Sequence, residues 1–142
     1  MSFLGTRAGP LADLALIISI AGFIILCLGV GYAKKGIFPR HFKMTRLAVL
    51  LASIAFMWMG FILIRFFRLI FSNFTTLLSL VRLFHIVIGT LALLTGIFFA
   101  FDRLIKKTRY PMRAVFILWT LALLLGVAVY VMRYISIISP PH

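Results

Sequence analysis

His85 is the residue of this chain best placed to do chemistry inside a membrane. It lies in the stretch Arg82-Leu83-Phe84-His85, about two turns into a long apolar run. An ionisable side chain at such a position indicates a functional site unless another helix satisfies it. Two interpretations stay open: a neutral imidazole that is hydrogen-bonded to a neighbouring helix or subunit, and an axial ligand of a b-type haem.

His41 is a weaker candidate, because it lies among basic residues before the second apolar run and reads as a loop residue at the membrane surface. His41 and His85 fall at opposite ends of antiparallel segments, so roughly 25–30 Å of hydrocarbon separates them. One haem therefore cannot take both as axial ligands. A haem on His85 would need Met57, Met59, an open position or a ligand from another protein.

A second set of candidates consists of arginines that the segment boundaries bring to one end of the molecule. They are Arg65, Arg68, Arg82 and Arg133. Arg82 and His85 share a helical face at spacing i, i+3, and Asp13 is the one acid expected nearby. The arginines either extend to lipid headgroups or bind anions from outside the chain, namely carboxylates of a partner subunit, lipid phosphates or haem propionates.

The remaining side chains argue against self-sufficient catalysis. The chain has 142 residues with only 2 acids, Asp13 and Asp102, and 1 cysteine, Cys27. These leave no paired carboxylates for acid–base work, no Ser-His-Asp set and no cluster with metal-ligand spacing. We therefore predict that the chain is not an enzyme, that it holds no metal of its own, and that it binds no cofactor unless His85 holds haem b.

Four apolar segments must position these side chains. With 64% hydrophobic residues and a mean hydropathy of +1.20, the chain carries more apolar surface than a soluble domain of this length can bury. The composition predicts an all-α, four-helix transmembrane bundle in a single domain, residues 1–142, with helices at about 11–33, 44–71, 77–101 and 112–135. Strands are excluded because an open sheet edge cannot lie in hydrocarbon.

The two halves of the chain resemble each other. Gly22 and Gly29 match Gly89 and Gly96 at the same sequence separation. Each half is predicted to cross the membrane twice, so that it begins and ends on the same side. The pattern favours a bundle of two repeated helical hairpins. Glycines at these spacings also offer small faces where helices can approach closely.

Basic residues are concentrated at the ends of the apolar segments. The 15 Lys and Arg give a net charge of +13, and ten of them lie in two stretches, 34–46 and 103–113. The positive-inside rule places these two loops in the cytoplasm and both termini on the outer side of the cell membrane. Bases at such positions suit anionic headgroups, so we predict lipids and other integral membrane subunits as partners, and no nucleic acid.

Three stretches carry a resemblance to a known family: Gly36-Ile-Phe-Pro-Arg-His41-Phe-Lys-Met44, Phe84-His85-Ile-Val-Ile-Gly-Thr-Leu-Ala-Leu, and Leu118-Trp119-Thr-Leu-Ala-Leu-Leu-Leu-Gly126-Val-Ala-Val-Tyr130. They resemble the start of the second helix, the histidine-led third helix and the final helix of a small prokaryotic membrane family. This is the family catalogued as domain of unknown function four-twenty, which includes a maturation factor for haem–copper terminal oxidases. The resemblance covers most of the chain.

The chain also departs from that family. The family carries further histidines at the outer end of its second helix and just before its fourth. Here these regions read Ile64-Arg65-Phe66-Phe67 and Lys107-Thr108-Arg109-Tyr110. The resemblance therefore does not imply a haem or metal role that rests on four histidines. A broader likeness to cytochrome-b-type four-helix anchors is one of architecture alone.

These observations predict a non-catalytic accessory or assembly subunit of a larger membrane respiratory or oxidase-type complex. The first alternative is an electron-transfer subunit that binds one b-type haem through His85. The second is a small transporter or channel. The shortage of intramembrane acids and the lack of broken helices argue against transport.

Overall fold

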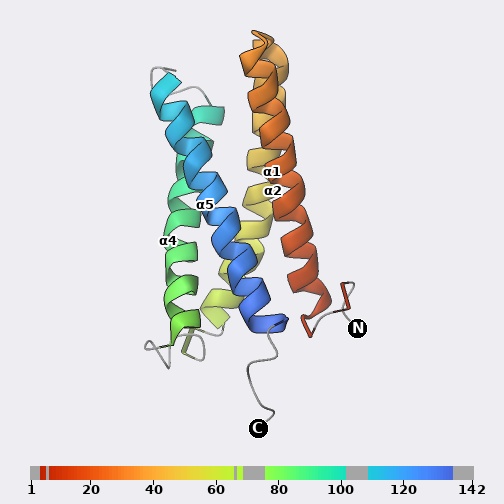
Figure 1. The fold of residues 1–142 in the computed structure, drawn as a ribbon, viewed down its shortest axis with the longest axis vertical. Helices are drawn as coiled ribbons and strands as arrows, with labels where there is room; N and C mark the ends of the chain where they lie inside the picture. The colour runs from red at the N-terminus through yellow and green to blue at the C-terminus, as the bar shows by residue number, and fades with distance from the viewer. Residues whose placement is uncertain (1–3, 6, 66, 69–75, 102–108, 136–142) are drawn as a thin grey trace.

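The computed structural model describes residues 4–5, 7–65, 67–68, 76–101 and 109–135. Within these ranges the chain is all-helical, without strands, and its long helices lie side by side (Figure 1). The helices are α1 (Pro10–Lys34), α2 (Phe38–Arg65), α4 (Leu77–Ala100) and α5 (Arg109–Tyr134). Each is long and apolar enough to cross a membrane. The predicted all-α bundle of four membrane helices is confirmed.

The turn between α1 and α2 begins at the predicted place, directly after the first helix, but it is shorter than predicted. Gly36 adopts a positive φ of +74°, which only glycine adopts without a steric cost. The N–H of Gly36 donates to the carbonyl of Ala33 (3.1 Å), and the N–H of Ile37 donates to that of Tyr32 (2.9 Å). This pair of bonds is a Schellman motif, which satisfies the last carbonyl groups of α1.

The predicted start of the second helix, near residue 44, is wrong. The helix α2 begins at Phe38, because Pro39 occupies a first-turn position where its missing N–H has no partner to lose. His41 therefore lies in the first turn of α2, not in a loop. Long basic side chains can extend from such a turn to the headgroups, so basic residues can belong to the first turns of a membrane helix. Residues 69–71, in which the second helix was predicted to continue, lie outside the described residues.

The bundle consists of two antiparallel hairpins. The helix α1 packs chiefly along α2, and α4 packs chiefly along α5, whereas the contacts of α2 with α4 and of α1 with α5 are smaller. We call the end where α1 begins and α5 ends the terminal end, and the opposite end the loop end (Figure 1). Two hairpins agree with the sequence prediction, while their duplication and their orientation in the membrane stay predictions.

The half of the bundle toward the loop end holds the packed core. The buried residues of this core are Leu26, Ala48, Val49, Ala92, Ala100 and Trp119. The indole N–H of Trp119 donates to the carbonyl of Ala92 (2.8 Å), and a Cβ on Gly96 would lie 3.0 Å from the indole ring. Small residues on α4 thus make the space that the tryptophan of α5 fills.

Polar contacts join the hairpins at both ends. At the loop end, Nε of Arg46 on α2 donates to the carbonyl of Ala100 (3.3 Å), the last residue of α4. At the terminal end, the hydroxyl of Tyr130 on α5 donates to the carboxylate of Asp13 on α1. Asp13 is 0% exposed.

Candidate functional site: a cavity between the hairpins

A cavity of about 310 Å³ lies between the two hairpins in the half toward the terminal end, and all four helices line it. This volume is at the lower limit of small-molecule sites in proteins. Much of the wall consists of small residues: Ala12, Ala15, Ala52, Ala55, Gly60, Gly89, Ala92, Ala122 and Gly126. The space remains open because these positions carry at most a methyl group.

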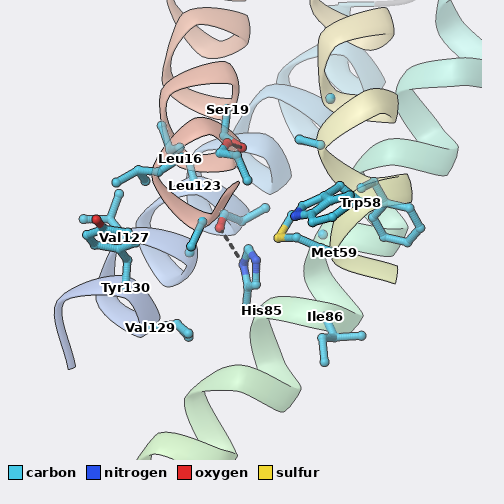
Figure 2. Close-up of a pocket in the computed structure, with 18 of the residues that line it drawn as sticks. Leu16, Ser19, Trp58, Met59, His85, Ile86, Leu123, Val127, Val129 and Tyr130 are labelled. Carbon is cyan, nitrogen blue, oxygen red and sulfur yellow. Dashed lines mark hydrogen bonds between the residues drawn. The ribbon is translucent and has the colours of Figure 1, made fainter. Parts of the chain in front are cut away.

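His85 enters the cavity from α4 (Figure 2). Its Nδ1 lies 2.9 Å from the carbonyl oxygen of Ala122 on α5. A carbonyl only accepts hydrogen bonds, so Nδ1 carries the hydrogen, and in the neutral ring Nε2 keeps a lone pair. A Cβ on Gly126 would lie only 2.9 Å from Cε1 of His85. The glycine on α5 therefore makes the space in which the imidazole lies.

The first interpretation of His85 predicts a hydrogen bond to a neighbouring helix, and the structure shows one, to a backbone carbonyl of α5. It also leaves one ring nitrogen for a ligand. A metal-binding histidine commonly has this arrangement, with the second nitrogen held by a backbone carbonyl. The two interpretations of His85 are therefore compatible in this fold.

Trp58 and Met59 of α2 lie across the cavity from His85 (Figure 2). The indole Nε1 of Trp58 is buried and has no hydrogen-bond partner among the residues that the structure describes. Met57 points elsewhere: its side chain is 76% exposed, and it does not line the cavity. Of the two methionines proposed as a second haem ligand, only Met59 lines the cavity that His85 enters.

Two of the four candidate arginines belong to this cavity. Arg82 is half-buried and Arg133 is exposed, and both line the cavity where it approaches the terminal end. The guanidinium group of Arg133 lies over the ring of Tyr134, at 5.4 Å from its centroid. Two cationic side chains beside an apolar space could bind an anionic group.

The other candidates lie elsewhere. Arg65 and Arg68 are exposed near the end of α2 and do not line the cavity. His41 is at the loop end, where its Nδ1 lies 2.9 Å from the carbonyl oxygen of Gly29 on α1. The two histidines are thus at opposite ends of the bundle, as the sequence predicts. The structure brings together His85, Arg82 and Arg133, and leaves the other three candidates outside the site.

Sequence reasoning missed two contributions to this region. The sequence named Asp13 only as an acid near the arginines, and the structure shows that it accepts hydrogen bonds from the Tyr130 hydroxyl and from the Leu4 N–H (3.2 Å). Trp58 was not among the candidate site residues, although it lines the cavity and its buried indole N–H has no partner among the described residues. The sequence did contain a signal for Trp58, because it lies inside a membrane helix and tryptophan prefers the membrane interfaces.

Comparison with protein-family models, curated proteins and solved structures finds no match for this chain. The resemblance to domain of unknown function four-twenty therefore stays a prediction. Within the described ranges, no three His, Cys, Asp or Glu side chains come together in a way that could hold a metal ion. The site offers binding groups instead: a hydrogen-bond acceptor on His85, a donor on Trp58 and two cations.

Proposed function

We propose that this chain is a non-catalytic accessory or assembly subunit of a larger membrane respiratory or oxidase-type complex. The observation that carries the proposal is the one-sided charge of the terminal end. Arg68 and Arg133 are exposed there, whereas Asp13, the only acid among the described residues, is completely buried against Tyr130. A partner subunit with carboxylates at the same level would complement this end of the bundle.

Two further features support the proposal. Large apolar side chains remain exposed along every helix, among them Ile24, Leu50, Phe84 and Leu124, and they offer surface against which partner membrane helices could pack. The resemblance to a family that includes an oxidase maturation factor implies the same class of function.

The charged end provides the test. When the protein is purified from its native membrane in mild detergent, we expect companion membrane subunits to be retained. Replacing both Arg68 and Arg133 with Glu should remove most of the companion, because like charges across an interface repel. Arg113→Glu, at an exposed position near the loop end, is the control and should retain it. A wild-type protein that purifies alone as a stable monomer would contradict the proposal.

A second candidate function, that of an electron-transfer subunit with one b-type haem, is favoured by the hydrogen bond of His85. Because Nδ1 is bonded to Ala122, Nε2 could hold the iron, and Met59 is the side chain on the same cavity that could complete its coordination. Arg82 and Arg133 could bind the propionates. When bound, the haem would supply one-electron transfer.

An optical spectrum tests this second candidate. Protein isolated from the native membrane should show Soret and alpha bands in the reduced-minus-oxidised difference spectrum. The bands should disappear in His85→Leu and persist in His41→Leu, because His41 lies at the opposite end of the bundle. If the wild-type protein shows neither band, the haem function is excluded.

A further inference from the structure

We propose that the cavity between the hairpins binds one acyl chain of an anionic amphiphile, with its head group at Arg82 and Arg133. The chemistry is that of an alkyl chain ending in ester, phosphate or carboxylate oxygens, as in an anionic phospholipid or a free fatty acid. This site lies inside the bundle and does not depend on the accessory role proposed above.

The shape of the cavity suits an alkyl chain. Its wall on α4 extends from Arg82 to Leu93, which at the rise of an α-helix corresponds to roughly 16 Å along the bundle. With a volume of about 310 Å³, the space is long and narrow. Beyond the arginines its wall is largely apolar, with Phe23, Leu93 and Trp119 at the deep end. A flexible chain can fill such a space and bury its methylene groups there.

The cations give the site its polarity. Arg82 is half-buried, and Arg82 and Arg133 both line the cavity near the terminal end, so an anion bound there can interact with both guanidinium groups. Guanidinium groups bind phosphate and carboxylate oxygens through paired hydrogen bonds. An anionic head group at the terminal end therefore fits better than a zwitterionic or neutral one.

The indole of Trp58 supplies a third point of contact. Its buried N–H has no acceptor among the described residues, and water is scarce at the depth of a membrane helix, so the missing hydrogen bond is costly. An ester or carboxyl oxygen of the amphiphile would accept from it. His85 cannot provide a competing donor from Nδ1, because that hydrogen is already donated to Ala122.

Native mass spectrometry of the isolated chain tests the site, with phosphatidylglycerol and phosphatidylcholine of identical acyl chains as probes. We expect one retained phosphatidylglycerol for each chain and weaker retention of phosphatidylcholine. Arg82→Gln should weaken the retention of phosphatidylglycerol about tenfold, since it removes a charged hydrogen-bond donor. Trp58→Phe, which keeps an aromatic ring but lacks the N–H, should weaken it several-fold.

Arg113→Gln is the matched control, because it makes the same change at an exposed position outside the cavity. Helical circular dichroism establishes that each variant is folded. The proposal is overturned if the two lipids are retained equally, if Arg113→Gln weakens retention as much as Arg82→Gln, or if the cavity ligand has the mass of haem. A competition arm identifies the source: displacement by oleate supports a free fatty acid, and resistance to oleate supports a phospholipid.

Because lipid binding is measured on the isolated chain, this experiment can fail while companion subunits still co-purify. The accessory role can equally fail while the lipid is retained. The two proposals are therefore separable.

Discussion

Replacing Gly126 with alanine is expected to displace His85 and to lower the free energy of unfolding by about 2 kcal/mol. The added Cβ would lie 2.9 Å from Cε1 of His85, a distance at which the imidazole ring must move. Moving the ring also lengthens its hydrogen bond to the carbonyl of Ala122. The measurement is equilibrium unfolding in mixed micelles, followed by tryptophan fluorescence.

Gly31→Ala is the control for this substitution. Gly31 is also in the interior of a helix, but a Cβ there meets nothing within 4 Å. We expect it to be neutral or to stabilise the protein by up to about 1 kcal/mol, because alanine is the better helix former.

A double mutant gives a second check of the contact between Gly126 and His85. In a protein that carries His85→Ala, Gly126→Ala should cost little, since the ring it would strike is gone. If Gly126→Ala costs as much with or without His85, the close approach described above does not decide the conformation of this site.

Replacing Tyr130 with phenylalanine is expected to lower the free energy of unfolding by about 2 kcal/mol. The substitution keeps the ring and removes only the hydroxyl, which donates to the buried carboxylate of Asp13. A carboxylate without exposure to solvent has no water to replace that donor, and the contact joins α1 to α5 where the two hairpins otherwise touch little.

Tyr110→Phe is the control, because Tyr110 is 84% exposed at the loop end and the same hydroxyl is removed there. It should leave stability unchanged. A double-mutant cycle of Tyr130→Phe with Asp13→Asn isolates the contact, and the two changes together should cost clearly less than the sum of the two alone. Additive costs would mean that the two side chains do not stabilise each other.

The four helices follow from the sequence because each is a local property. A segment of about 20 apolar residues must be helical in hydrocarbon, where every backbone group needs a partner within its own segment. The end of the first helix was equally predictable, because two lysines end the apolar segment and are followed by Gly36. Glycine readily adopts the positive φ with which many helices end. The start of α2 was placed too late, because basic residues were taken as a loop although Arg40 and Lys43 belong to its first turns.

The candidate site was only partly predictable. His85 and Arg82 stand out in the sequence because a charged or ionisable residue in an apolar run is costly and needs a partner. Because a helix turns by about 100° per residue, Met57 and Met59 point to opposite sides of α2. Met59 lines the cavity, whereas Met57 is exposed on the outer surface of the bundle. The sequence alone did not show which face of this helix points toward His85, so it could not distinguish the two methionines.

What the sequence determined by itself is therefore the number of membrane helices, their approximate ends and the chemical types available to them. The tertiary structure decided which of these types meet. Asp13 and Tyr130 are 117 positions apart, and the carbonyl that holds His85 belongs to a residue 37 positions away. Such pairings depend on how one helix is rotated and shifted against the next. The side chains at the interface fix that geometry jointly, and no local pattern encodes it.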